Sequence, residues 1–354
     1  MPTFKIATIA GDGIGQEVIP EAKRILQAVE KKFDVRFEFL DFDWGASYYF
    51  RHGRMCPLDF LDQLRPVDAI LLGAIGHPEI PDHVTLNGLL LPIRRNFDQF
   101  VNLRPAVLYG GVQSPLALRR GEQIDMMVVR ENTEGEYSQV GGFVYHEQPE
   151  EIAIQTSVFT RRGTERVIRY AFELARKRNK KNRVTSVTKS NAQGYGMVLW
   201  DRTFAAVASE YPDIVTESLL VDAAAMNFVR RPESFDVVVA SNLFGDILSD
   251  ISAILVGSMG LAPSANLDPT RRFPSMFEPV HGSAPDIAGK GMANPLAAIF
   301  SVAMMLEHLG MPAAAESVNV AVAGVLAEGN LRTPDLGGTS KTGEVTEGVL
   351  GCLG

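Results

Sequence analysis

A regular alternation of short β-rich runs and amphipathic helical segments is the feature that most limits the fold of this chain. Lys5–Ala10 is predicted to be a strand, and Glu17–Lys32 follows it with apolar residues at helical spacing. Because strands that alternate with helices are covered on both faces, this pattern favours an α/β protein with a largely buried sheet. Further strands are expected at Val35–Phe42, Ala69–Leu72, Asp125–Val129, Arg183–Thr188 and Asp236–Ala240, and further helices at Leu58–Leu64, at Arg162–Arg178 and in the apolar stretch Ala293–Leu306.

Size and composition exclude several classes of protein. A chain of 354 residues is long for one compact core, which predicts two subdomains or one large α/β unit. Apolar residues make up 46% and charged residues 21%, as in soluble globular proteins, and the net charge of −8 argues against a nucleic-acid partner. Two cysteines cannot form a disulfide framework. No signal peptide or membrane-spanning stretch is visible, so we expect a cytoplasmic protein without a membrane partner.

The segment GDGIG at residues 11–15 lies between a predicted strand and a predicted helix, where dinucleotide-binding turns occur. The Gly-x-Gly-x-x-Gly fingerprint needs glycine at position 16, and this chain has Gln16 there. A phosphate-binding P-loop would need a lysine after the glycines, and Gln16 and Glu17 supply none. A tight turn without a ligand and a ligand-binding turn both remain open.

Three arginines are candidates for an anion site. Arg94 and Arg104 lie ten residues apart in IRRNFDQFVNLRP, and Arg130 follows the expected strand in VVRENTEGEY. Arginine binds carboxylates through two parallel hydrogen bonds, and the end of a strand is a usual position for a site. Surface salt bridges are the alternative interpretation.

The carboxylates in DVVVASNLFGDILSDISA favour a cation site. Asp246 and Asp250 are four residues apart, so they share one face of the expected helix. Like charges at that spacing repel unless a cation or a base lies between them, and oxygen ligands alone suit Mg²⁺ or Mn²⁺. Asp222, after an apolar run, is a third candidate ligand. Helix capping or a surface pair is the alternative.

Two further residues are candidates for proton transfer. Lys189 follows the strand-like run VTSVT, and a lysine at a strand end beside carboxylates can serve as a base. Tyr137 is the candidate for the complementary acid. Both residue types are also common on protein surfaces.

The segment Met276–Pro295 is dense in glycine, proline, alanine and small polar residues. Structureless connections of this length are usually functional, so we expect its backbone to wrap a ligand. Asp286 could accept hydrogen bonds from a ribose diol and would repel a 2′-phosphate, which favours NAD over NADP.

The segment Gly141–Ile154 has β-prone residues and a polar centre but no helix partner. An isolated hairpin is marginally stable in water. We therefore expect this segment to pack on another surface, such as a second subunit.

Taken together, these segments resemble the β-decarboxylating dehydrogenases, the family of isocitrate, isopropylmalate, homoisocitrate, D-malate and tartrate dehydrogenases. The matching stretches are GDGIG, FDQFVNLRP, VVRENTEGEY, TKSN, SNLFGDILSD and EPVHGSAPDIAGKGMANP, and they follow the family's order over almost the whole chain. The resemblance implies the isocitrate/isopropylmalate dehydrogenase fold, which has two α/β domains and a dimerisation arm and is not a Rossmann fold. Residues 1–101 and 259–354 would form a large cofactor-side domain, and 102–258 a small central domain with the dimer arm near 141–154.

The resemblance also implies a role for each candidate residue. Tyr137 and Lys189 of the partner subunit would form the acid/base pair. Asp246 and Asp250 would bind the divalent metal together with Asp222 of the partner subunit. Substrate carboxylates would be bound by Arg94, Arg104 and Arg130, and NAD by Glu278, His281, Gly282, Ser283, Ala284, Pro285, Asp286 and Asn294.

The implied reaction is the oxidation of a 2-hydroxy diacid by NAD, with loss of CO₂. The implied metal is Mn²⁺ or Mg²⁺, with K⁺ as a further candidate cation. The enzyme would be a homodimer whose active sites are shared between the subunits, and its partners would be small diacids rather than nucleic acids or membranes.

The residues before Arg94 reduce the number of candidate substrates within the family. Gly88 and Leu90 stand where isocitrate enzymes carry serine and asparagine, which argues against isocitrate. Leu90 and Leu91 match the leucine pair of isopropylmalate enzymes, but Asn87 replaces their acidic residue. The stretches FDWGASYYFRHGRMCP, TKSNAQGYGMVLWD and VFTRRGTERVIRYAFELA look most like the tartrate and D-malate dehydrogenase branch.

We therefore expect a D-malate or tartrate dehydrogenase, with 3-isopropylmalate dehydrogenase as the alternative. A non-catalytic nucleotide- or anion-binding homologue is the alternative from another class. Such a homologue should lack a metal carboxylate or Lys189, and this chain keeps them.

Overall fold

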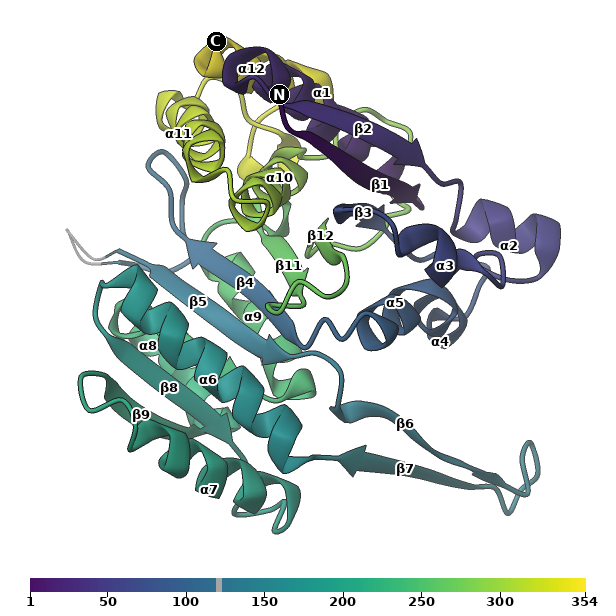
Figure 1. Cartoon of the computed structure of the whole chain (residues 1–354), viewed down its shortest axis with the longest axis vertical. Coiled ribbons are helices and arrows are strands. Elements are labelled where there is room, and N and C mark those ends of the chain that lie inside the picture. Colours follow the sequence, from purple (N-terminus) through teal and green to yellow (C-terminus); the bar gives the residue numbers. More distant parts are fainter. Residues whose placement is uncertain (119–122) are drawn as a thin grey trace. The chain divides into compact units, whose positions relative to one another are not determined.

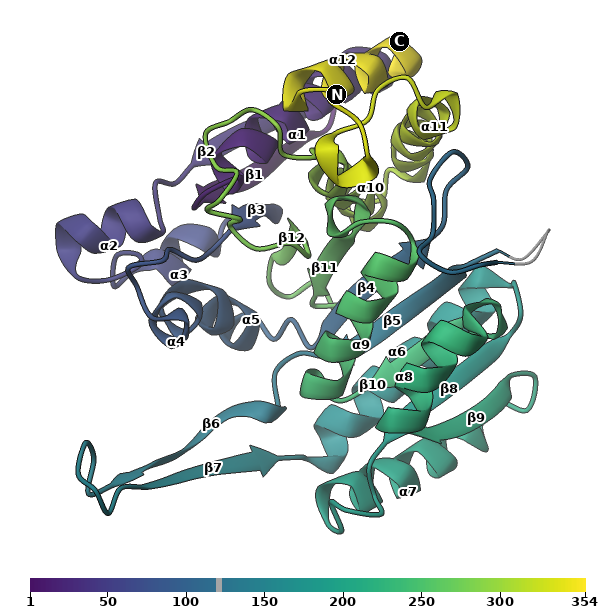
Figure 2. The same ribbon diagram turned by 180° about the vertical axis from the view of Figure 1, so that it is seen from behind.

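The computed structural model describes residues 1–118 and 123–354, which form two compact units (Figures 1 and 2). The first unit comprises Met1–Gln99, the described part of Leu103–Ile124, and Ser252–Gly354. The second unit comprises Phe100–Asn102 and Asp125–Ile251. The boundaries expected from the sequence assign 102–258 to the central domain, so the two divisions differ mainly at 103–124.

The strands of the first unit follow the order β2-β1-β3-β12-β11-β4. β1 is parallel to both β2 and β3, β12 is parallel to β3, and β11 is antiparallel to β12. β3 is buried along its whole length, as expected for a central strand covered on both faces. The strands are β1 (Thr3–Gly11), β2 (Arg36–Asp41), β3 (Ala69–Ala74), β4 (Val101–Val107), β11 (Pro263–Leu267) and β12 (Ser275–Pro279).

Helices of the first unit bury apolar faces against this sheet and against each other. α1 (Gly15–Phe33) buries Val18, Ala22 and Leu26, which recur at helical spacing. α10 (Leu296–His308) is buried on almost every side, which explains its nearly continuous apolar sequence. The other helices are α2 (Ala46–His52), α3 (Phe60–Leu64), α4 (Asp82–Thr85), α5 (Leu91–Asn96), α11 (Pro312–Glu328) and α12 (Thr342–Leu353), with short helical turns at Leu86–Leu90, Met259–Leu261 and Pro334–Leu336.

The second unit contains four parallel strands in the order β5-β10-β8-β9. α6 crosses one face of these strands, and α8 and α9 lie on the other face (Figures 1 and 2). The strands are β5 (Asp125–Glu131), β8 (Arg183–Thr188), β9 (Val215–Leu220) and β10 (Val237–Ala240). The helices are α6 (Arg161–Arg178), α7 (Gly196–Ala208), α8 (Val221–Arg230) and α9 (Asn242–Leu255), with a short turn at Pro232–Ser234.

A two-stranded antiparallel hairpin extends from the second unit (Figure 1). It consists of β6 (Gly135–Val144) and β7 (Ile152–Val158), so it is longer than the segment 141–154 expected from the sequence. Its tip exposes Phe143, Tyr145 and Ile154, each by more than half. Large exposed apolar side chains on a thin hairpin favour the expected contact with another surface.

The element predictions are confirmed, with shifts of a few residues at the ends. One expectation was wrong in part: Met276–Pro295 is not irregular throughout, because its first four residues belong to β12. β12 is fully buried between neighbouring strands, and that burial outweighs the turn-prone composition of the segment. No helix among the described residues is long and apolar enough to cross a membrane.

Candidate active site

The carboxyl ends of the four parallel strands bring predicted site residues of the second unit to one edge of the sheet. Arg130 is the next-to-last residue of β5, Lys189 follows β8, and Asp222 is the second residue of α8, directly after β9. α9, which carries Asp246, begins shortly after β10. This edge is where open α/β sheets bind their ligands, because helix starts and loop side chains converge there.

Arg130, Tyr137 and Asp246 are in direct contact. The Asp246 carboxylate accepts a hydrogen bond from Arg130 Nη1 through Oδ1 and one from Tyr137 Oη, at 2.7 Å, through Oδ2. The Arg130 guanidinium lies 5.1 Å from the centroid of the Tyr137 ring. Arg130 is buried and balances the negative charge of the Asp246 carboxylate. The carboxylate can therefore accept the Tyr137 hydrogen bond without remaining an unpaired charge.

Asn242 orients Arg130. Its Oδ1 accepts hydrogen bonds from Arg130 Nε at 2.9 Å and from Nη2 at 2.7 Å. Gly245 allows the helix to approach the strand this closely, since a Cβ there would lie 2.6 Å from Arg130 Cβ. Sequence reasoning missed both residues. Their position in SNLFGD was the available signal, because Asn242 lies one turn before the predicted metal ligand Asp246 and Gly245 lies directly before it.

The predicted metal ligands do not form one cluster within this chain. Asp246 and Asp250 both lie on α9, but no group of three acidic, histidine or cysteine side chains that could hold a metal occurs among the described residues. Asp222 instead forms an ion pair with Lys189 Nζ at 2.5 Å, which lowers the pKa of the Asp222 carboxyl. The α9 pair fits a hard divalent cation, because its donors are carboxylate oxygens and the Asp246 side chain is 28% exposed.

In the first unit, Arg94 and Glu278 form a buried ion pair. Arg94 Nη2 donates to Glu278 Oε1 at 2.7 Å, and Asn266 Nδ2 donates to the same oxygen at 2.7 Å. A predicted substrate residue therefore contacts a predicted cofactor residue, and Asn266 is a further residue that the sequence did not reveal. Arg104 is also buried, but it lies inside β4 and not at a strand end.

The GDGIG turn connects three loops of the first unit. The Asp12 carboxylate accepts hydrogen bonds from the backbone amides of Ala46, at 2.7 Å, and Gly76, at 2.9 Å, while burial raises its pKa. Ile14 N donates to Ser283 O at 2.9 Å. Gly13 has a φ of +53°, and a Cβ on it would meet that carbonyl oxygen, so only glycine fits there. The segment is thus a tight turn, and it holds the predicted cofactor loop through Ser283.

Most of the predicted cofactor residues follow β12 in a stretch without regular structure, whereas Glu278 lies within β12. His281 Nε2 is buried and has no hydrogen-bond partner among the described residues, and burial lowers the pKa of the ring. A buried polar atom without a partner fits a site that a polar ligand completes. The rest of the predicted set, Gly282, Ser283, Ala284, Pro285 and Asp286, is exposed or partly exposed.

Asp335 is a residue of this region that sequence reasoning missed. It accepts a hydrogen bond from Asn294 Nδ2 at 3.0 Å, and others from Ser258 and Thr333. It also borders a cavity of about 240 Å³ that includes Arg332. Its position in the turn-rich stretch RTPDLGG was the only sequence signal. Asp335 therefore connects the predicted cofactor residue Asn294 to the lining of this cavity.

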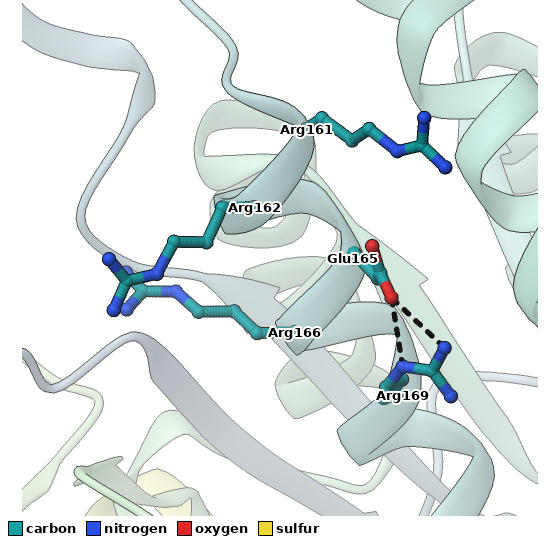
Figure 3. Close-up of a pocket in the computed structure, with 5 residues that line it drawn as sticks. All are labelled: Arg161, Arg162, Glu165, Arg166 and Arg169. Atoms are coloured by element: carbon teal, nitrogen blue, oxygen red, sulfur yellow. Dashed lines mark hydrogen bonds and ion pairs between the residues drawn. The ribbon is translucent and has the colours of Figure 1, made fainter.

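A larger hollow of about 530 Å³ lies at the start of α6 and contains none of the predicted site residues (Figure 3). Four arginines and Glu165 line it, and Arg169 is already paired with Glu165 and Glu210. Figure 3 shows Arg161 pointing away from the neighbouring Arg162 and Arg166. This hollow is a charged surface of one helix and is separate from the contacts described above.

Comparisons with known proteins show the family of this chain. A sequence model of the family described as isocitrate/isopropylmalate dehydrogenase matches residues 5–349. The chain is 51% identical to the tartrate dehydrogenase/decarboxylase of Pseudomonas putida, covering 99% of this chain and 98% of that protein. It is 50% identical to the decarboxylating D-malate dehydrogenase of Escherichia coli K12, covering 99% and 98%.

A solved structure gives the same result. The crystal structure of isocitrate dehydrogenase from Methylococcus capsulatus matches with a TM-score of 0.88 and 36% identity, covering 99% of both chains. The family, the branch and the fold expected from the sequence are therefore confirmed, as is the expectation of a decarboxylating dehydrogenase.

Proposed function

We propose that this chain, which belongs to the isocitrate/isopropylmalate dehydrogenase family, uses NAD and a divalent metal to oxidise and decarboxylate D-malate or tartrate. The observation that carries the proposal is the contact of Arg130, Tyr137 and Asp246 near the carboxyl ends of the parallel strands of the second unit. The names of relatives about half identical to the chain support the substrate class.

The arginines would bind the two carboxylates of the diacid. Arg130 and Arg94 are buried, and each is oriented by a neighbouring amide or carboxylate, so little rotational entropy is lost when they bind an anion. Arg104 would complete the set. Because the guanidinium groups are positively charged, the site would favour a dianion over neutral hydroxy compounds.

Tyr137 and Lys189 of the partner subunit would move protons. Lys189 would accept the proton of the substrate hydroxyl, and the Tyr137 phenol would donate a proton to the carbon that loses CO₂. The hydrogen bond to Asp246 fixes the direction of the phenol. We propose that the apolar hairpin joins two chains into a homodimer, so that the two proton-transfer residues of each site come from different subunits.

Asp246 and Asp250, with Asp222 of the partner subunit, would hold Mn²⁺ or Mg²⁺. When bound, such a metal would supply Lewis-acid polarisation of the substrate, and NAD would supply the hydride acceptor. Glu278 at the end of β12 and residues of the following loop would hold the dinucleotide. The loop residues are His281, Gly282, Ser283, Ala284, Pro285, Asp286 and Asn294. The exposed Asp286 carboxylate would repel a 2′-phosphate and so favour NAD.

The residues before Arg94 favour a small diacid over 3-isopropylmalate. Leu91 is buried, and Leu90 packs against the core of the first unit. The Asn87 side chain donates to His83 O at 2.7 Å, within its own helical segment. With both leucines packed against protein, less of their apolar surface remains for an isopropyl group.

The deciding experiment measures NADH formation with Mn²⁺ and K⁺ present. D-malate, L-tartrate, meso-tartrate and 3-isopropylmalate would be compared by kcat/KM with NAD and with NADP. We expect the highest value for D-malate or a tartrate with NAD, and loss of activity on chelation that Mn²⁺ restores. A preference for 3-isopropylmalate would contradict the substrate proposal. NADH binding without turnover of any diacid would favour the non-catalytic homologue.

A further inference from the structure

Two glutamates of the segment ENTEGEY each bind the start of a different helix. Glu134 accepts hydrogen bonds from the backbone amide and the hydroxyl of Thr160, at 2.8 and 2.6 Å, just before α6. Glu136 accepts one from Ser241 Oγ at 2.8 Å and one from Leu243 N at 3.1 Å, at the start of α9. A carboxylate at either position pairs with amides that the helix itself leaves without partners, and it faces the positive end of the helix dipole.

Only the helix bound by Glu136 carries a predicted metal ligand. This ligand is Asp246, which lies three residues after Leu243 on α9. Its carboxylate accepts a hydrogen bond from the hydroxyl of Tyr137, the residue that follows Glu136 in the sequence. Asn242 Nδ2 adds a third link by donating to Glu134 O at 3.1 Å. Hydrogen bonds between residues 134–137 and residues 241–246 thus join the strand that presents the phenol to the helix that presents the carboxylate.

Rigid attachment of this kind controls the distance between a proton donor and a metal ligand. Without Glu136, Ser241 and Leu243 lose their acceptor, and the first turn of α9 can fray or tilt. The Tyr137 Oη to Asp246 Oδ2 distance would then vary with that turn. Residues that orient metal ligands from behind commonly contribute about 10- to 100-fold to metal affinity or activity.

We propose that Glu136 is a positioning residue that holds α9, and with it Asp246, in register with Tyr137 for metal binding and proton transfer. This inference rests on the proposed function. It assigns to Glu136 no contact with substrate or metal. Glu136 would act through its bonds to the first turn of α9 and through the hydrogen bond from Tyr137 to Asp246.

The test compares Glu136 with Glu134. E136A removes both bonds to α9, whereas E136Q keeps an oxygen that can accept one of them. E134A and E134Q are matched controls, because the Glu134 side chain makes an equivalent pair of bonds to the start of α6. The Glu134 backbone oxygen, which Asn242 of α9 binds, is kept in both variants. For all four variants, kcat, KM, the melting temperature and the Mn²⁺ dissociation constant would be measured, the last by the paramagnetic signal of free Mn²⁺.

We expect E136A to weaken Mn²⁺ binding and to lower kcat by about 10- to 100-fold, with KM for the diacid changed much less. The Mn²⁺ affinity and kcat of E136Q should lie between the values for E136A and those for the unsubstituted enzyme. The melting temperatures of the Glu134 variants should fall by about as much as those of the Glu136 variants. Their Mn²⁺ affinity and kcat should stay within about 3-fold of the values for the unsubstituted protein. Equal losses in kcat and Mn²⁺ affinity for the two alanine variants would overturn the proposal.

The metal readout separates this inference from the proposed function. If the unsubstituted protein turns over no diacid, the proposed function fails, but the Mn²⁺ affinities of the E136A and E134A variants can still be compared. Selective weakening by E136A would then support the positioning role by itself. Unchanged Mn²⁺ affinity in E136A would refute that role whatever the substrate.

Discussion

Removal of the charge on Glu278 should destabilise the first unit strongly. The side chains of Glu278 and Arg94 are 9% and 5% exposed, and their atoms Oε1 and Nη2 are 2.7 Å apart. In Glu278→Gln the Arg94 guanidinium keeps its charge but loses its counter-ion in a site that water barely reaches. Breaking one side of a buried pair costs about 3–5 kcal/mol. Each kcal/mol lowers the melting temperature of a domain of this size by about 2–4 °C, so we expect a fall of about 6–20 °C.

The assay is thermal unfolding followed by calorimetry, with Glu347→Gln as a matched control. Glu347 also pairs with an arginine, Arg24, but its side chain is 66% exposed, so its loss should cost less than about 1 kcal/mol. The double variant R94M/E278L should recover most of the stability, because no charge is left buried. Equal effects of E278Q and E347Q would refute the reasoning, since they would mean that water solvates the buried pair.

Three further predictions concern chemistry, packing and pH. Lys189→Ala and Tyr137→Phe should each lower kcat by about 10²- to 10⁴-fold with unchanged circular dichroism, and near-normal turnover in both would contradict their proposed roles. Gly245→Ala should lower the free energy of unfolding by about 1–3 kcal/mol and raise KM for the diacid, because the new Cβ would lie 2.6 Å from Arg130 Cβ. An unchanged midpoint of chemical denaturation would contradict this prediction. Burial lowers the pKa of His308 from 6.5 to about 4, so the unfolded chain binds a proton that the folded chain does not. The stability from neutral His308 should therefore be present above about pH 6.5 and fall by about 1–3 kcal/mol as the pH drops to about 4, and His308→Gln should flatten that part of the pH profile.

Local patterns in the sequence predicted most of the elements. The spacing of Val18, Ala22 and Leu26 depends only on the helical repeat, and α1 forms where that spacing predicts it. The same holds for Asp246 and Asp250, which share a face of α9 because they are one turn apart. The motif resemblance then supplied the family, which the comparisons confirm.

The partners of the site residues could not be predicted in this way. Arg130 meets Asp246 across 116 residues, and Arg94 meets Glu278 across 184. Glu136 was not singled out at all, because a glutamate at the start of a strand has no local signature of the helix that it will bind.

The sequence by itself therefore determined the strands, the helices and the residue types available for chemistry, because these depend on periodicity and composition within short windows. The tertiary structure alone decided which charges are buried, which carboxylate faces which arginine, and that Lys189 pairs with Asp222 in this chain. The physical reason is that burial and hydrogen-bond geometry are properties of two elements in contact. Strand order and helix approach set those properties, and neither can be read from one segment alone.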